Sequence, residues 1–330
     1  MSSIALLVVN YRSSALALDA IRTARAATAG PLQVVAVDNS VDEAEAEVLR
    51  GAADAVMASP ANVGYAAAIN SGRRACDAEL IVVSNPDVRF AAGAIDALAD
   101  AGAAVAGPAL FWDDAHRWLL PPADLHTRAE VIDRALAGRS RPWSSWRHRR
   151  RFHARLDFWS LRRTTRVRAI SGAVMAIRAR AFDDAGGFDE RFPLYFEEND
   201  FLRRVRGDVV YVPAARCRHL YNQSAGGSPE AATAYARSEG EYLRKWGGAL
   251  ARRFERPLAP PEPGSGASEG EIVTEASPLA AFETAAGFLG DADDVPADVW
   301  RVYRGETLYM RAMTRGGRVL RTWSRARMSA

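Results

Sequence analysis

The chain has 330 residues, 48% hydrophobic and 25% charged, which is an ordinary balance for one large globular domain or for a domain with an appendage. Its 43 basic and 40 acidic side chains leave a formal net charge of +3, which excludes a protein that is polybasic overall. Its two cysteines, Cys76 and Cys217, lie far apart and form no Cys-x-x-Cys motif, so we expect both to be reduced in a cytoplasmic protein.

The N-terminal segment MSSIALLVVNYRS is too short to span a bilayer, and it lacks the basic region and cleavage site of a secretion signal. No other segment of the sequence approaches a membrane span. We therefore expect any membrane contact to be peripheral. We expect the protein in the cytoplasm, and the inner face of the plasma membrane is the alternative location.

Apolar runs alternate with helix-period segments from the N-terminus onward. Strands are predicted at 4–9, 32–37 and 80–84, and helices at 14–27, 42–53 and 66–76. This alternation predicts a parallel α/β sheet, which binds ligands at the carboxyl ends of its strands. Polar residues gather at those ends, in the segments Asn10-Tyr11-Arg12, Asp38-Asn39-Ser40 and Asn85-Pro86-Asp87.

The middle of the chain predicts further elements. Strands are predicted at 102–110, 167–177 and 209–213, and helices at 179–185 and 197–205. Between 139 and 168 arginines are interleaved with aromatic residues such as Trp143 and Trp146. This basic insert has two open interpretations: a surface that meets phosphates, anionic lipid or nucleic acid, or a solvated helical face.

The amino-acid composition changes in the C-terminal part of the chain. Residues 256–271 are rich in Pro, Gly and Ser, which predicts a linker between a domain over 1–255 and a small module over 272–330. In that module Gly316-Gly317 predicts a hairpin, and a helix through 299–313 is the competing prediction. Docking on the domain over 1–255, dimerisation and substrate binding are all open roles for it, so a homodimer remains one of the alternatives.

Four groups of residues could carry chemistry, and each has a structural alternative. Asp38 could bind a base edge or form a turn, and Asp87 could bind a metal or end a strand. The helix start at 62–72 could hold a nucleotide or pack closely on the sheet. The acids at 197–200 could include a general base or stabilise a helix amino end.

The order of these motifs along residues 4 to about 245, ending at His219, closely resembles family 2 glycosyltransferases. More narrowly, it resembles the rhamnosyltransferase and galactofuranosyltransferase branch of bacterial polysaccharide and cell-wall assembly. The resemblance implies a GT-A fold: an α/β architecture with a mostly parallel Rossmann-like central sheet flanked by helices. It also implies an inverting transfer from a UDP- or dTDP-linked sugar to a hydroxyl, with Mg2+ or Mn2+ as cofactor.

The resemblance assigns roles by position. Nucleotide-sugar binding falls to Val9, Asn10, Tyr11, Asp38, Asn62, Gly64, Tyr65, Asn70, Asn85 and Asp87. The acceptor side falls to Gly172, Ala173, Gly187, Phe188, Asp189 and Glu190. Asp87 and His219 would bind the metal. Glu198 would be the base that takes the proton of the attacking hydroxyl, with Glu197 and Asp200 as alternatives.

The remaining alternatives concern partners and activity. The implied acceptor is a glycan or a polyprenyl-diphosphate-linked sugar. Glu198 stands where the family usually has an aspartate, which keeps a catalytically degenerate scaffold or nucleotide-binding subunit as the alternative function. Acids at the sheet edge argue against a nucleic-acid partner. No Gly-x-Gly-x-x-Gly follows the first strand, which argues against a dehydrogenase.

Overall fold

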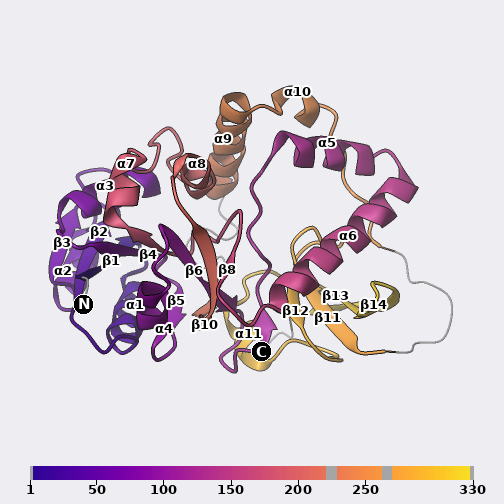
Figure 1. Ribbon diagram of the computed structural model, residues 1–330, viewed down its shortest axis with the longest axis horizontal. Helices are drawn as coiled ribbons and strands as arrows, with labels where there is room; N and C mark the ends of the chain where they lie inside the picture. The colour runs from indigo at the N-terminus through magenta and orange to yellow at the C-terminus, as the bar shows by residue number, and fades with distance from the viewer. Residues whose placement is uncertain (1–2, 221–228, 262–269, 328–330) are drawn as a thin grey trace. The chain divides into compact units, whose positions relative to one another are not determined.

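The computed structural model describes residues 3–220, 229–261 and 270–327. Its contacts divide the chain into two compact units. The first unit contains 1–110, 123–125 and 162–242, and the second contains 111–122, 126–161 and 243–330 (Figure 1). This division differs from a boundary at residue 255, because the basic insert groups with the C-terminal residues.

The first unit is a mixed sheet with helices on both faces. Its strands are β1 (Ile4–Asn10), β2 (Leu32–Asp38), β3 (Ala55–Ala58), β4 (Leu80–Ser84), β5 (Val88–Phe90), β8 (Thr165–Arg166), β9 (Val174–Arg178) and β10 (Val209–His219), and β6 (Val105–Phe111) runs across its boundary. Its helices are α1 (Ser14–Arg25), α2 (Glu43–Arg50), α3 (Tyr65–Arg74), α4 (Ala94–Asp100), α7 (Ala179–Asp184) and α8 (Glu197–Arg204), and α9 (Pro229–Trp246) also crosses that boundary.

Strands β3, β2, β1 and β4 lie side by side in parallel. Strand β9 is antiparallel to β4 and β6, and β10 is antiparallel to β5 and β8. The α/β prediction is thus confirmed, with parallel pairing confined to one half of the sheet. The strands at 4–9, 32–37 and 80–84 are confirmed as well.

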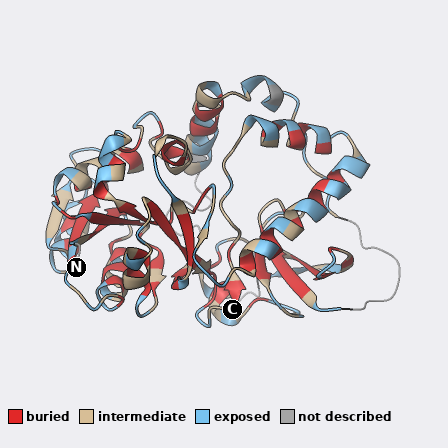
Figure 2. Ribbon diagram, viewed as in Figure 1, coloured by how far each residue is buried: buried red, intermediate tan, exposed pale blue. Residues whose placement is uncertain are grey.

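Alternating side chains of the strands supply two hydrophobic cores. Leu6 and Val8 of β1 lie in one core with α1, α2 and α4, whereas Leu7 and Val9 lie in the other with α3, α7 and α8. Figure 2 shows β1, β2 and β4 buried almost throughout. Because both faces are covered, polar groups reach ligands only at the strand ends.

One strand prediction was too long. The strand predicted at 167–177 begins only at Val174, because Gly172 and Ala173 form a turn. The strand predicted at 209–213 was too short, since β10 continues to His219. Both differences matter for the site, because the turn and the end of β10 carry residues assigned to it.

The second unit packs helices on an antiparallel sheet. Its strands are β7 (Trp118–Leu119), β11 (Ile272–Ser277), β12 (Ala286–Phe288), β13 (Thr307–Thr314) and β14 (Val319–Ala326), ordered β14-β13-β11-β12-β7. Its helices are α5 (Arg128–Ala137), α6 (Arg141–Trp159), α10 (Ala249–Arg252) and α11 (Ala297–Val302). Strands β13 and β14 form the predicted hairpin, so the competing helix through 313 is wrong.

Helix α6 explains why the insert belongs to this unit. Its side chains Phe152, Leu156 and Trp159 are buried in a core with Val273 and Met313 of the C-terminal strands. The linker predicted between them lies in part, at 262–269, outside the described residues. Of the helices that the structure describes, none is both long and apolar enough to cross a bilayer.

Candidate active site

The ends of β1 and β2 carry a buried polar network. The register pairs Asn10 with Asp38, and the Asn10 amide donates to Asp38 Oδ1 at 2.9 Å. The Ser40 hydroxyl donates to the same oxygen at 2.6 Å and accepts a bond from the Arg12 backbone N–H at 2.8 Å. Asp38 is only 1% exposed. These bonds fix the carboxylate that was assigned to the nucleotide base.

Sequence reasoning missed Glu45 of α2, which closes this network. Its Oε2 accepts from the Asn10 amide and from the Ser14 backbone N–H, both at 2.9 Å. Partial burial raises the pKa of Glu45, but these hydrogen bonds outweigh it and leave the pKa below its ordinary value. A first-turn position in a predicted helix was the sole sequence signal for this residue.

The turn that follows β4 is held from three directions. The Arg89 guanidinium donates to the carbonyls of Pro86 and Leu16 at 3.1 and 3.2 Å and pairs with Asp19 at 3.1 Å. The Asn85 backbone N–H donates to the Ala173 carbonyl at 2.9 Å. Arg89 was also missed by sequence reasoning, and it fixes the backbone that carries Asp87.

Pairing of β5 with β10 brings together two residues separated by more than 130 positions. Val88 lies opposite His219, and the His219 Nε2 lies 3.3 Å from Asp87 Oδ1. The Leu220 backbone N–H donates to the Asp87 carbonyl at 2.9 Å. The structure therefore joins the two side chains predicted to bind a metal.

Helix α8 begins with a buried acid, Glu197, and a half-buried one, Glu198. Glu197 Oε2 and Glu198 Oε2 are both buried and accept no hydrogen bond from the described residues. Burial, reinforced by the charge of Glu198, holds the pKa of Glu197 well above its usual range, and burial also raises the pKa of Glu198. A buried carboxylate oxygen without a donor is costly, so these oxygens indicate a place for a ligand or a proton.

The backbone before these acids is strained. Tyr195 and Phe196 both have φ of 68°, in the left-handed region that costs non-glycine residues of order 1–3 kcal/mol each. Phe196 is the residue that precedes the helix, so this conformation sets the direction in which α8 starts. Two adjacent strained residues at the start of the acidic helix are typical of a functional site.

Tyr65 links the acids to the start of α3. Its hydroxyl is buried without a hydrogen-bond partner among the described residues. Burial raises the pKa of Tyr65 well above its usual value, with further contributions from the charges of Glu197, Glu198 and Asp87. The charges of three assigned carboxylates therefore act on this one buried hydroxyl.

Gly172 allows the turn before β9 to approach α8. A Cβ at this position would lie 3.0 Å from Glu198 Cγ, closer than packed side chains normally come. Because Ala173 also binds the Asn85 backbone, this turn contacts both the strand-end motif and the acidic helix. Gly172 and Ala173 therefore lie beside the candidate base, where the acceptor was predicted to bind.

Asp200 is held in an ion pair with Arg204. It is fully buried, and its Oδ2 accepts from Arg204 Nε at 2.7 Å. Arg204 also donates to the carbonyls of Ala185 and, at 2.8 Å, Gly187. Asp200 thus anchors the turn after α7, which makes it a weaker candidate for the base than Glu198.

The remaining assigned residues shape the surroundings. Asn70 bonds both the N–H and the carbonyl of Phe188, each at 2.9 Å, and donates to Glu190 at 2.9 Å. Asp189 pairs with Arg191 at 2.7 Å. Two residues assigned to the nucleotide differ in exposure, because Val9 lies in the core and Tyr11 is exposed. The Asn62 side chain accepts a hydrogen bond from the Gly64 backbone N–H at 3.0 Å.

A metal fits Asp87 and His219 only in part. No group of three or more His, Cys, Asp or Glu residues that could hold a metal exists within the described residues. One carboxylate and one imidazole suit a divalent cation that takes its other ligands from diphosphate oxygens and water. The site thus fits a metal that binds together with a nucleotide.

A shallow cavity lies elsewhere in the first unit. It measures about 550 Å³ and is lined by Arg73, Ala78, Glu79, Arg178, Ala179, Arg180, Asp183 and Asp184. Glu79 precedes β4 and Arg178 ends the antiparallel β9, so this cavity is at the amino end of β4. It contains none of the residues assigned to the site.

The match to a family model identifies the class of this protein as a glycosyltransferase. Residues 2–240 match the model of the family described as glycosyltransferase like family 2. The chain belongs to this family, which confirms the resemblance derived from the motifs.

A curated relative and two solved structures are similar to this chain. The N-acetylglucosaminyl-diphospho-decaprenol L-rhamnosyltransferase of Mycobacterium tuberculosis is 30% identical over 236 residues, which is 62% of this chain and 71% of the relative. GalNAc-T7 with UDP, GalNAc and Mn2+ is 14% identical with a TM-score of 0.49, over 72% of this chain and 47% of that one. The mannosyltransferase PcManGT of Pyrobaculum calidifontis, with GDP-Man and Mn2+, is 13% identical with a TM-score of 0.44, over 77% and 72%.

Proposed function

We propose that this protein is an inverting transferase that moves a sugar from a UDP- or dTDP-linked donor to a hydroxyl of a lipid-linked acceptor. The observations that carry the proposal are the 3.3 Å approach of His219 Nε2 to Asp87 Oδ1 and the unpartnered oxygens of Glu197 and Glu198. The charges of Asp87, Glu197 and Glu198 all contribute to the raised pKa of Tyr65. The relative's name supports L-rhamnose as the sugar and an N-acetylglucosaminyl-diphospho-polyprenol as the acceptor.

Glu198 is the proposed base. Its raised pKa brings the carboxylate closer to the pH at which it must take a proton, which favours transfer from a hydroxyl. Asn199 donates to its Oε1 at 3.1 Å, which leaves Oε2 for the acceptor hydroxyl. In a single in-line displacement this proton moves to Glu198 as the new glycosidic oxygen bond forms.

Asp87 and His219 are the proposed holders of Mg2+ or Mn2+. When bound, the metal offsets the negative charge that grows on the departing diphosphate. The fixed network of Asn10, Asp38 and Ser40 would orient the nucleoside base. We also propose peripheral contact with the inner face of the plasma membrane, where a polyprenyl acceptor lies.

The test is transfer by the purified chain from UDP- and dTDP-linked sugars with Mn2+, measured as nucleoside diphosphate released with acceptor present. The variants Asp87→Ala and Glu198→Gln should each lose transfer while circular dichroism shows a native fold. Full activity in either variant contradicts the role assigned to that residue.

The scaffold alternative retains one supporting observation, the glutamate at position 198 where the family usually has an aspartate. Calorimetry with UDP, dTDP and GDP, each with and without Mn2+, separates the two functions. A transferase should bind Mn2+ tightly only with a nucleotide present, since two side chains alone make an incomplete site. A scaffold need bind neither.

A further inference from the structure

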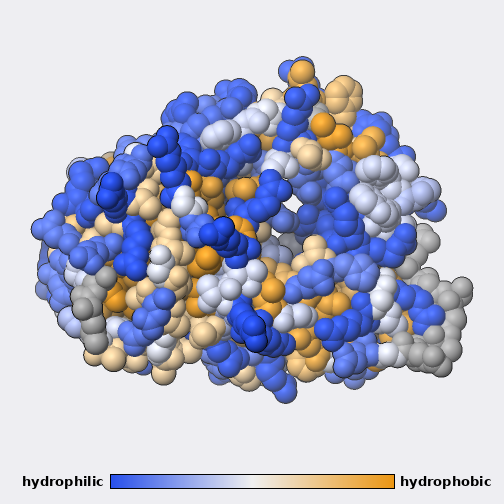
Figure 3. Space-filling model, in the orientation of Figure 1, coloured by the Kyte–Doolittle hydropathy of each residue, from blue (hydrophilic) through white to orange (hydrophobic). Residues whose placement is uncertain are grey.

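The second unit carries exposed apolar side chains on two short segments. Six of the thirteen exposed large apolar side chains in the described residues lie between 132 and 146 or between 250 and 254: Ile132, Leu136, Trp143, Trp146, Leu250 and Phe254. Leu250 is 74% exposed and Phe254 is 58% exposed. Figure 3 shows hydrophobic side chains over α10 and α5, among hydrophilic ones. We call these six residues the apolar surface.

Contacts within the second unit join the members of the apolar surface. The Trp143 indole donates to Asp133 of α5 at 2.9 Å, and its ring lies 5.1 Å from that of Trp146. The Arg139 guanidinium lies 5.7 Å above the Phe254 ring, and α10 packs against α5. The six side chains therefore belong to neighbouring elements and form one region rather than scattered exposures.

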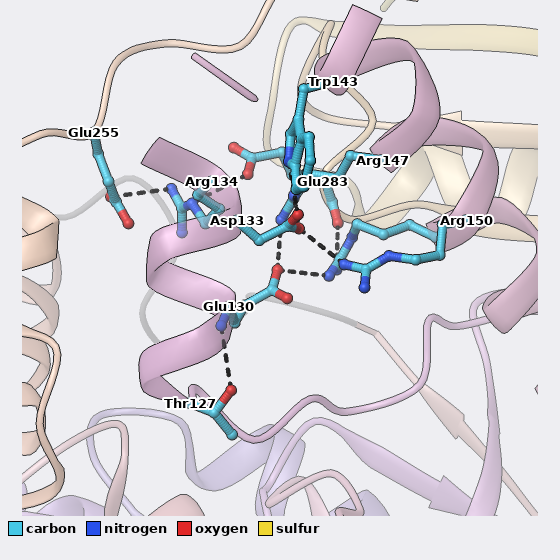
Figure 4. A network of polar contacts seen from close by, with 10 residues as sticks. Thr127, Glu130, Asp133, Arg134, Trp143, Arg147, Arg150, Glu255 and Glu283 are labelled. Carbon is cyan, nitrogen blue, oxygen red and sulfur yellow. Dashed lines mark hydrogen bonds and ion pairs between the residues drawn. The ribbon is translucent and has the colours of Figure 1, made fainter. Parts of the chain in front are cut away.

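The acids of these segments point inward. Glu130 and Asp133 pair with the buried Arg147 at 2.5 and 2.8 Å, and Glu255 pairs with Arg134 at 3.7 Å (Figure 4). No Asp or Glu is exposed in the described residues of 126–156 and 249–256. This arrangement removes negative charge from the outer face.

Arginines supply the exposed charge of the same segments. They are Arg128, Arg139, Arg141, Arg149, Arg150, Arg252, Arg253 and Arg256. An arginine at a lipid surface keeps its guanidinium among phosphates while its methylene groups cover apolar area. Indole rings favour the same interface, and aliphatic side chains enter the acyl boundary. The combination is complementary to lipid headgroups that carry negative charge.

We propose that the apolar surface and its arginines dock on the face of a membrane rich in anionic phospholipid. This deepens the peripheral contact proposed above and rests on it, because it names the surface and the class of lipid. A second copy is disfavoured as occupant, because two-fold pairing would set these arginines against their own counterparts.

Sedimentation of the full chain with vesicles tests the docking. The protein should pellet with vesicles of phosphatidylcholine and phosphatidylglycerol and stay in the supernatant with phosphatidylcholine alone. Binding should weaken as salt rises, because the arginine contribution is screened.

Two double variants test the surface itself. Leu250→Ser with Phe254→Ser removes the two most exposed apolar side chains of the region, and Arg149→Gln with Arg253→Gln removes two exposed charges. Each charge removed should weaken partitioning about fivefold. The matched controls, Val48→Ser and Arg180→Gln, change exposed residues of the first unit and should bind as the wild type does.

Several outcomes overturn the docking. The first is failure of the wild type to pellet with anionic vesicles at low salt, and the second is full binding by both double variants. The third is a dimer of the wild type that the Leu250→Ser, Phe254→Ser variant no longer forms, although the variant binds vesicles as well as the wild type does. Transfer to a soluble acceptor analogue is measured without vesicles. Transfer without vesicle binding therefore rejects the docking alone, and vesicle binding without transfer rejects the proposed activity alone.

Discussion

The two units bury carboxylates in different surroundings. In the second unit Glu275 is fully buried between Arg155 and Arg311, at 2.7 and 2.6 Å. In the first unit Glu197 is buried and the adjacent Glu198 is half-buried, and each has one buried oxygen that no described residue bonds. Burial alone would raise the pKa of Glu275, but the two guanidiniums lower it, whereas the pKa values of Glu197 and Glu198 are raised. An acid compensated by fixed cations serves the fold, and an acid left uncompensated is available for chemistry.

The largest expected effect is a loss of transfer when the uncompensated acid Glu198 is replaced. Glu198→Gln should lower kcat by about 10³-fold or more, since the amide cannot accept the proton. It should also raise Tm. The folded-state pKa of Glu198 is raised, so its contribution to stability falls as pH rises above the unfolded-state value. Thermal scans of both proteins without metal should converge at low pH and separate at neutral pH.

A variant that is inactive and less stable at neutral pH would contradict this contrast. It would mean that Glu198 supports the fold as Glu275 does. Gln is the suitable replacement because it keeps the size of the side chain beside Gly172.

The reverse result is expected at the compensated acid. Glu275→Gln should lower the free energy of unfolding by about 3–5 kcal/mol, because two buried guanidiniums lose their counter-charge. Urea denaturation measures this change. Transfer per folded molecule should be unchanged, and loss of transfer in fully folded protein would contradict the assignment of Glu275 to the fold.

His148, in the second unit, makes the free energy of unfolding depend on pH. Burial, followed by the charge of Arg311, lowers its pKa from 6.5 to about 4. The unfolded chain therefore takes up a proton that the folded chain does not, and stability falls as pH decreases from 6.5 to 4. The loss attributable to His148 is at most about 3 kcal/mol.

His148→Gln isolates that contribution, because the amide can still donate to the Ala259 carbonyl that lies 3.2 Å from the imidazole. The difference in unfolding free energy between wild type and variant should change across pH 4–6.5 and be constant above it. A constant difference throughout would show that the imidazole has the same pKa in the folded and the unfolded chain, which would contradict the lowered pKa.

The smallest expected effect is on kcat, from a substitution at Gly172 beside Glu198 in the first unit. Gly172→Ala puts a methyl group 3.0 Å from Glu198 Cγ, so the carboxylate must move. A displacement of this kind should lower kcat about 10- to 100-fold with little change in KM for the donor. Steady-state kinetics measures both. Gly240→Ala is the matched control, since a Cβ at Gly240 meets no atom within 4 Å.

The sequence predicted the part of the site that depends on parallel strands. Asn10, Asp38 and Asp87 follow predicted strands, and the ends of parallel strands meet at one edge. Asp87 and His219 were joined only by the family resemblance, since their contact depends on an antiparallel pairing that neither segment signals. Glu45 and Arg89 were missed because an acid on a helix or an arginine on a strand ordinarily reads as a solvated side chain.

The organisation of the second unit was harder to predict. Arg155 and Glu275 are 120 residues apart, and in sequence the arginines of α6 suggest a solvent-exposed helix. Helical periodicity cannot show that Arg147 and Arg155 are buried while Trp143 and Trp146 of the same helix are exposed. That inversion depends on carboxylates supplied by α5 and β11, which only tertiary structure reveals.

The salt bridge between Arg155 and Glu275 also has a consequence for biosynthesis. Arg155 leaves the ribosome 120 residues before Glu275 does. At roughly 5–20 residues per second, the two are separated by roughly 6–24 s of translation. During this interval the face of α6 that carries Phe152 and Trp159 lacks the C-terminal strands that cover it. The nascent chain therefore exposes an apolar face of α6 that the finished protein buries against its C-terminal strands.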